Sequence, residues 1–120
     1  MGWDAYATEN GGKEIKVIWG KIPNLQNKEY KKVFEASVDK VLETVDEVDW
    51  LLSLGGLDCS CFARKIEEVT GKSCWNEDGY TPEEVKEMLE DFVKTEEPYD
   101  SAYAFVESCA KLGLGMGFSY

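Results

Sequence analysis

Four cysteines have the widest chemical range in this chain, because a thiolate can bind zinc, form a disulfide or act as a nucleophile. They are Cys59, Cys61, Cys74 and Cys109. Zinc ribbons and fingers usually bring two pairs of cysteines two to four residues apart, whereas this chain has one pair, and it is tighter. If residues 60–70 form a helix, its ends lie about 16 Å apart, too far for a disulfide between Cys59 and Cys74. The spacing therefore predicts reduced, structural thiols and no bound metal.

A nucleophilic cysteine is the sharper alternative. Cys59 and Cys61 lie at the amino end of a predicted helix, and the positive end of a helix dipole favours the thiolate. However, the chain contains no histidine that could act as the base. The carboxylate of Asp58 would raise the pKa of a neighbouring thiol rather than lower it. Catalysis by cysteine is therefore not expected.

Carboxylates are the most abundant chemical groups, with 24 Asp and Glu against 13 Lys and Arg and a net charge of −11. Acids four residues apart, such as Glu43 and Glu47 or Glu83 and Glu87, share one face of a helix. That arrangement is compatible with two-carboxylate hydrolysis or Mg²⁺ binding, but chance also produces it in so acidic a chain. The sequence contains no Walker loop, dinucleotide-binding glycine motif or serine-nucleophile elbow. No catalytic residue and no cofactor is therefore predicted.

The charge is distributed unevenly. Residues 1–40 carry seven Lys and six acids, whereas residues 41–120 carry six basic residues and eighteen acids. A chain with this balance repels nucleic acid and anionic membranes, and it attracts basic surfaces.

The longest periodic run of apolar residues, 28–54, is the element around which the chain is expected to fold. Its apolar residues fall three or four apart, which predicts a helix, and Gly55-Gly56 can end that helix. At about 1.5 Å per residue the run would be about 40 Å long, longer than a small domain is wide. We therefore expect either one bent helix or two helices that break near residues 46–49.

Strand patterns lie at both ends of the chain. Residues 3–8 and 14–19 predict a hairpin, in which a three-residue loop places Ala5 opposite Val17 and gives one apolar face. Residues 113–120 alternate between apolar side chains and Gly or Ser. Bare glycines in a strand often mark a close approach by a backbone, a large ring or a ligand. The C-terminal strand is expected beside the hairpin in a three-stranded antiparallel sheet.

Three shorter apolar periods after the long run predict further helices. The clearest local signal is Thr81, Pro82 and Glu84, which are typical of a Thr cap, a Pro in the first turn and a Glu that reaches back. Gly113 can end the last helix, which is expected over residues 100–112.

Together these elements predict one domain over residues 1–120 with an α+β fold. Four or five helices are expected to pack on a small sheet made of the N-terminal hairpin and the C-terminal strand. The sequence shows no secretory segment and no long uncharged apolar run, so a cytoplasmic protein is expected.

In composition the chain resembles small accessory proteins encoded by phages and viruses: it is short and acidic, it lacks histidine and it is rich in aromatic residues. Those proteins include inhibitors of host defence such as anti-CRISPR proteins, some of which imitate nucleic acid. The resemblance implies an inhibitor that acts in the host cytoplasm. It rests on composition and assigns no site residue.

The function expected from the charge is that of a non-enzymatic interaction protein, which presents an acidic face to a basic, nucleic-acid-binding partner. Two alternatives remain open: a small hydrolase that uses carboxylates or a metal ion, and a structural or assembly subunit with an apolar patch around Trp50 and Trp75. The candidate partner-binding residues are acids on or near predicted helices: Glu43, Asp46, Glu47, Asp49, Glu83, Glu84, Glu87, Glu90, Asp91, Glu96 and Glu97.

Overall fold

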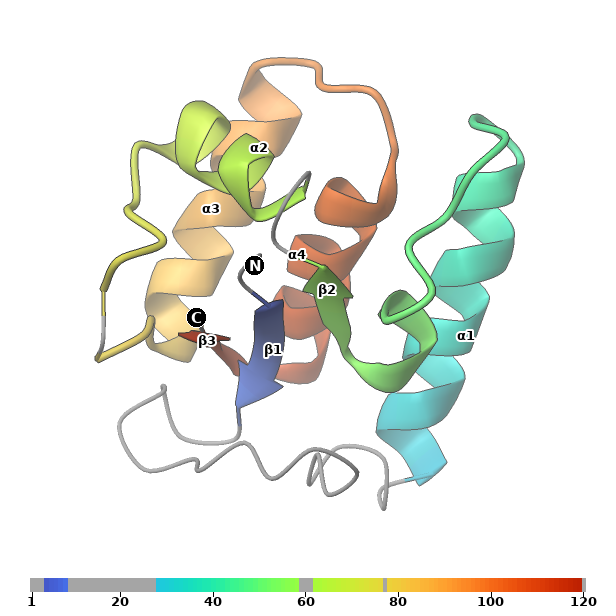
Figure 1. Cartoon of the computed structure of the whole chain (residues 1–120), viewed down its shortest axis with the longest axis horizontal. Coiled ribbons are helices and arrows are strands. Elements are labelled where there is room, and N and C mark those ends of the chain that lie inside the picture. The colour runs from blue at the N-terminus through green and yellow to red at the C-terminus, as the bar shows by residue number, and fades with distance from the viewer. Residues whose placement is uncertain (1–3, 9–27, 59–61, 77, 120) are drawn as a thin grey trace.

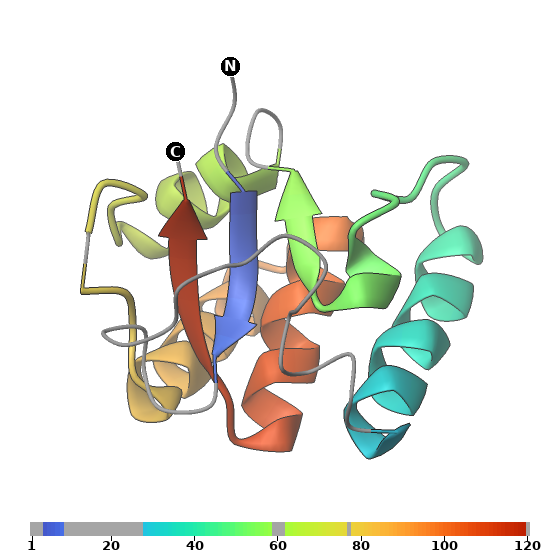
Figure 2. The same cartoon turned by 60° about the horizontal axis from the view of Figure 1, so that its bottom comes forward.

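The computed structural model describes residues 4–8, 28–58, 62–76 and 78–119. In Figure 2 the three strands lie in front of the α-helices, which pack behind one face of the sheet. The described residues therefore form an α+β fold with four α-helices and a three-stranded antiparallel sheet, as the sequence predicts. In chain order the elements are β1 (Asp4–Thr8), α1 (Lys28–Leu42), the 3-10 helix η2 (Leu52–Leu54), β2 (Gly56–Asp58), α2 (Phe62–Thr70), α3 (Pro82–Lys94), α4 (Ser101–Leu112) and β3 (Gly115–Ser119).

The sheet has the strand order β2-β1-β3, so the N-terminal strand is its central strand. Ala5 pairs with Leu57 of β2 on one side and with Phe118 of β3 on the other. The predicted pairing of the C-terminal strand with the N-terminal strand is therefore confirmed. The prediction of the third strand is wrong, because β2 holds the edge of β1 that the hairpin would need at Ala5. Residues 14–19, the predicted second strand of that hairpin, lie outside the described residues.

Gly56 explains how β2 reaches this position. A Cβ atom at Gly56 would lie 2.9 Å from the carbonyl oxygen of Ala5, closer than such atoms can pack. Only glycine therefore allows the two backbones to approach here. Gly55, the preceding residue, has a φ of 78° and ends η2. The pair of glycines ends a 3-10 turn, not the long helix that the sequence predicts, and it also begins a strand.

The long apolar run does not form a helix over its whole length. α1 ends at Leu42, and residues 43–51 form an irregular connector before η2. We call residues 43–51 the α1–η2 connector. The predicted break near residues 46–49 falls inside it. The expectation of one bent helix is wrong, and the chain continues beyond the break as a 3-10 turn and a strand rather than as a second α-helix.

Polar side chains give the α1–η2 connector its own hydrogen bonds in place of helical ones. The Thr44 hydroxyl lies 3.1 Å from the carbonyl oxygen of Val41 and 2.6 Å from that of Tyr99. The Asp49 carboxylate accepts a hydrogen bond from the backbone N–H of Leu51. Because Thr and Asp side chains compete with the backbone in this way, apolar periodicity alone overestimates the helix.

The local signals at the later helices are confirmed. Thr81 Oγ1 accepts from the N–H of Glu84, and the Glu84 carboxylate accepts from the N–H of Thr81, which completes the capping box of α3. Gly113 follows α4 with a φ of 69°. α1 and α3 both pack on α4, which lies between them (Figure 1). Most of α4 is buried, including Phe105 and Cys109.

The described helices are shorter than a bilayer-spanning segment. α1, the longest of them, has 15 residues, whereas crossing the hydrocarbon core takes about 20 apolar residues. Within the residues that the structure describes, no helix combines the length and the apolar character needed to cross a membrane.

A large ring fills the space left by one bare glycine of β3. Tyr6 of β1 pairs directly with Gly117. A Cβ atom at Gly117 would lie 2.7 Å from Cε2 of the Tyr6 ring. The expectation that bare glycines mark a close approach is therefore confirmed at Gly117, where the approaching group is an aromatic ring.

Replacing Gly117 by Ala is expected to lower the free energy of unfolding by about 1–3 kcal/mol, because the new methyl group overlaps the Tyr6 ring. Denaturant unfolding measures this change. The control is the same substitution in a Tyr6→Ala background, where the cost should shrink because the ring is gone. An equal cost in both backgrounds would show that the ring does not require a glycine at this position.

Candidate functional site

The structure divides the candidate acids between two sides of the molecule. α4 contacts both α1 and α3 and separates them (Figure 1). The acids of the α1–η2 connector therefore lie on one side of α4, and those of α3 lie on the other. They do not form the continuous acidic face that the sequence suggests. Glu96 and Glu97 belong to neither group, because they lie in the segment that joins α3 to α4.

Several acids of α3 already have partners. Glu84 closes the capping box described above. Glu87 pairs with Lys72 at 3.5 Å, and Asp91 is half-buried. Glu83 and Glu90 are exposed and form no ion pair with any described residue. Two exposed lysines, Lys86 and Lys94, lie on the same helix. Much of the charge of α3 is therefore balanced locally.

A more acidic part of the surface lies toward one end of α1 and α3. The carboxyl ends of α1 and α3 lie in the upper part of Figure 1, on either side of the amino end of α4. The hydrogen bond from Thr44 to the Tyr99 carbonyl ties the α1–η2 connector to the segment between α3 and α4. Four exposed acids of this region form no ion pair within the described part of the chain. We call these four residues the acidic end: Glu43, Asp46, Glu47 and Glu96.

The acidic end is electrostatically unfavourable for the protein alone. Glu43 directly follows α1, and Glu96 is the second residue after α3. The carboxyl end of a helix carries a partial negative charge, which favours cations nearby and disfavours anions. Charges that oppose a local preference of this kind are expected where a protein functions rather than where it is only stabilised.

The backbone of Glu96 adds a second local cost. α3 ends with hydrogen bonds from the N–H of Glu96 to the Val93 carbonyl and from the N–H of Glu97 to the Phe92 carbonyl. This Schellman arrangement needs a left-handed residue, usually glycine. Glu96 adopts it with a φ of 53°, and it is the only described residue other than glycine with a positive φ. At the end of α4 the same position is held by Gly113.

Glu97, by contrast, is bound into the structure. It pairs with Lys65 of α2 at 3.8 Å. The same ammonium contacts the carboxylate of Asp100, whose other oxygen caps α4 by accepting from the N–H of Tyr103. Glu97 therefore helps to hold α2 against the start of α4 and is not available to a partner.

Asp49 lies in the interior, not on the predicted surface. It is 7% exposed. Its carboxylate accepts from the N–H groups of Leu51 at 2.9 Å and Asp58 at 2.6 Å, and its own N–H donates to Ser101 Oγ at 2.8 Å. Asp49 thus fixes the backbone on both sides of Trp50, whose side chain is 66% exposed.

Trp50 gives the acidic end a large apolar neighbour. It lies three residues from Glu47 and four from Asp46, so a fully extended chain would separate them by no more than about 14 Å. Leu42, which directly precedes the α1–η2 connector, is also 50% exposed. This part of the chain therefore presents carboxylates without a described ion-pair partner and apolar side chains together.

Three carboxylates that the sequence pattern does not group lie near one end of the sheet. Asp4 of β1 pairs directly with Asp58 of β2, to whose N–H Asp49 is bonded. Burial raises the pKa of Asp4, and the charges of Asp58 and Asp49 raise that pKa further. The sequence could have shown that these three carboxylates lie together only if β2 had been predicted, because the pairing of β1 with β2 places Asp58 beside Asp4. Within the described residues, no group of His, Cys, Asp and Glu side chains is arranged to hold a metal ion.

Two of the four cysteines can be placed. Burial raises the pKa of the Cys74 thiol to about 12, with a further rise from Glu67, and burial alone raises the pKa of Cys109. Both side chains are therefore protonated at neutral pH and pack in the interior. Cys59 and Cys61 lie outside the described residues.

No protein-family model matches the chain, and neither a curated protein nor a solved structure matches it.

Replacing Asp4 by Asn is expected to raise the melting temperature at pH 7. The raised pKa means that folding disfavours the ionised carboxylate, so ionised Asp4 lowers stability at neutral pH. This advantage should shrink as the pH falls through the folded-state pKa and vanish below the ordinary value of 3.8, where Asp4 is protonated in both states. Thermal unfolding at several pH values measures it. Asp39→Asn, an equal charge change on an exposed residue of α1, is the control. A gain that persists unchanged below about pH 3 would contradict this explanation.

Replacing Glu96 by Gly is expected to raise the free energy of unfolding by about 1 kcal/mol, because glycine adopts the left-handed conformation without strain. Glu90→Gly is the matched control, since the same change inside a helix should lower stability by a similar amount. Denaturant unfolding of both variants gives the comparison. If both variants lose stability, Glu96 is not strained.

Proposed function

We propose that the chain is a non-enzymatic interaction protein that binds a basic protein surface, of the kind that normally binds nucleic acid. The contact would be made by the acidic end together with Trp50. The observation that supports this proposal is an exposed tryptophan on a fixed backbone, next to carboxylates that have no ion-pair partner among the described residues. The compartment proposed for this activity is the cytoplasm, of a host cell if the chain is viral.

Trp50 is suited to anchor such a contact. Tryptophan is enriched among the few interface residues that supply most of the binding energy. Because the Asp49 hydrogen bonds hold the backbone beside it, little main-chain freedom would be lost on binding. A preorganised anchor of this kind improves affinity by lowering the entropic cost of association.

The acidic end is suited to select the partner. Its carboxylates attract Lys and Arg side chains over several ångströms and raise the rate of encounter. A basic partner would also relieve the repulsion that these charges suffer at the ends of α1 and α3. With a net charge of −11, the chain is repelled by nucleic acid itself. It would therefore bind in place of nucleic acid, which agrees with the compositional resemblance to viral inhibitors.

The assembly-subunit alternative is supported by a different observation. Trp75 and Val93 are 67% and 57% exposed. The ion pair between Lys72 and Glu87 holds the segment that contains Trp75 near α3. An assembly interface would use this side of the molecule and would depend little on salt. For the hydrolase alternative, the described residues offer no supporting geometry.

We expect the two parts of the surface to act on different rate constants. The binding partner for this test is a basic, nucleic-acid-binding protein identified by cross-linking in the native cell. Neutralising the acidic end should slow the association of the chain with this partner by about tenfold at low salt. Trp50→Ala should mainly speed dissociation. Biolayer interferometry at about 50 and about 500 mM salt, on either side of the ionic strength where screening becomes strong, measures both constants. The neutralised variant carries Glu43→Gln, Asp46→Asn, Glu47→Gln and Glu96→Gln.

The control variant makes the same change in net charge elsewhere on exposed positions. It carries Asp39→Asn, Glu68→Gln, Glu83→Gln and Glu90→Gln. This variant should keep most of the association rate. Equal slowing in both variants would show that only the net charge matters. Binding that is indifferent to salt, and lost in Trp75→Ala rather than in Trp50→Ala, would favour the assembly alternative.

A further inference from the structure

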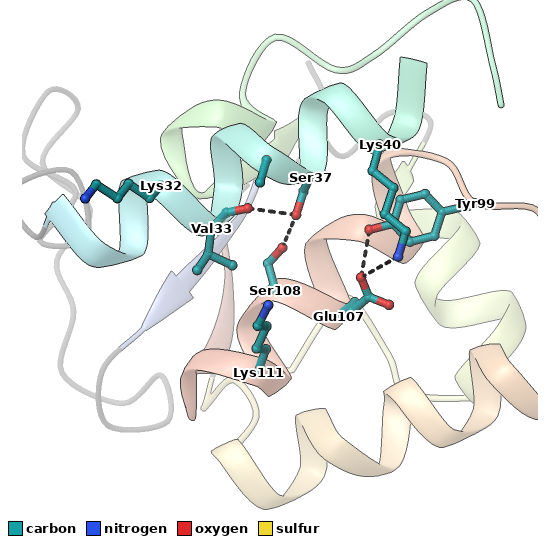
Figure 3. A pocket seen from close by; sticks show the side chains of 9 residues that line it. Lys32, Val33, Ser37, Lys40, Tyr99, Glu107, Ser108 and Lys111 are labelled. Atoms are coloured by element: carbon teal, nitrogen blue, oxygen red, sulfur yellow. Dashed lines mark hydrogen bonds and ion pairs between the residues drawn. The ribbon is translucent and has the colours of Figure 1, made fainter. Parts of the chain in front are cut away.

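A small cavity lies between α1 and α4. Its volume is about 260 Å³, below the usual range of about 300–1,000 Å³ for pockets that hold drug-sized ligands. Figure 3 shows Ser37 and Ser108 meeting between the two helices. We call this cavity the α1/α4 groove. It is lined by Lys32, Val33, Ala36, Ser37, Lys40, Tyr99, Glu107, Ser108 and Lys111.

The groove gathers positive charge in a strongly acidic chain. Three of the 13 basic residues line it, against a single acid, Glu107. Lys40 lies 3.4 Å from the Glu107 carboxylate and 4.3 Å from the centre of the Tyr99 ring, so its charge is balanced. Lys32 and Lys111 form no ion pair within the described part of the chain. Two lysines without a described carboxylate partner therefore line one small cavity, and the Lys111 ammonium group lies near Ser108 in Figure 3.

The other polar groups of the groove are already engaged. The Ser37 hydroxyl donates to the Val33 carbonyl at 3.0 Å, so the proton shared with Ser108, 2.5 Å away, comes from Ser108. The Tyr99 hydroxyl donates to Glu107 at 2.8 Å. Lysine ammonium groups are therefore the donors that remain for a ligand.

We propose that the α1/α4 groove binds a small organic anion, with a phosphate or carboxylate head group on a compact apolar body. Lys111 and Lys32 would bind the head group. Lys32 extends along α1 away from Ser108 in Figure 3, but its four-carbon stem is flexible enough to turn. Val33 and Ala36 supply the apolar wall. The proposal does not depend on the proposed function, since it uses none of the residues of the acidic end.

The test is a titration of the whole chain with phenyl phosphate, followed by two-dimensional NMR of its backbone amides. Amide signals of Ala36, Ser37 and Ser108 should shift and saturate. Benzyl alcohol, which has the ring without the charge, should leave them unchanged. Inorganic phosphate separates the two parts of the ligand and should bind more weakly. If it binds as tightly as phenyl phosphate, the apolar part of the proposal is overturned.

Matched variants separate a local site from a general effect of charge. Lys32→Ala with Lys111→Ala should weaken phenyl phosphate binding by at least about fivefold, because exposed ion pairs each contribute modestly. Lys86→Ala with Lys94→Ala makes the same change in net charge on α3 and should leave the affinity unaltered. Equal weakening in both variants, equal binding of benzyl alcohol, or no saturable shift at millimolar phenyl phosphate would each overturn the proposal.

The Glu107→Gln variant is expected to change the affinity for phenyl phosphate in the opposite direction. Without the carboxylate, Lys40 loses its ion pair, and a third ammonium group becomes available to the anion. Phenyl phosphate should therefore bind several-fold more tightly. Weaker binding by this variant would overturn the assignment of the groove to anions.

Discussion

The hydrogen bonds of Asp49 hold together parts of the fold that lie far apart in the sequence. One carboxylate oxygen binds the N–H of Leu51 at the start of η2, and the other binds the N–H of Asp58 in β2. Its backbone N–H binds Ser101 in the first turn of α4. These bonds close the segment that leads into β2, the strand at one edge of β1. A buried carboxylate left without these partners would be costly, so the α1–η2 connector and the sheet edge depend on each other.

Local signals predict most of the later part of the chain. The Thr81 capping box and the Gly113 stop involve residues within a few positions of one another, and the structure shows both. The alternation of β3 is also readable, including the bare Gly117. These features succeed because their physical causes are local: orphan N–H groups, left-handed backbone and the period of a strand.

The sequence-based predictions fail where contacts between residues far apart in the sequence determine the structure. Residues 43–54 keep the apolar spacing of a helix, but Thr44 and Asp49 find backbone partners elsewhere. β2 has three residues, too few to give a strand pattern, and its position depends on the closeness of Gly56 to Ala5. The candidate acids show the same limit. Their number follows from composition, but only the structure shows that Asp49 is buried and that Glu87 and Glu97 are paired.

The central position of β1 affects the order of events during synthesis. β1 leaves the ribosome before either of its neighbouring strands. Its residue Asp4 pairs with Asp58 and also with Ser119, which lies at the far end of the described chain. The sheet therefore cannot close until residues 115–119 have emerged, whereas the helices need only local contacts. Until then the β3 edge of β1 has no partner, even after β2 has emerged, so an emerging chain exposes a strand edge that can pair wrongly with another chain.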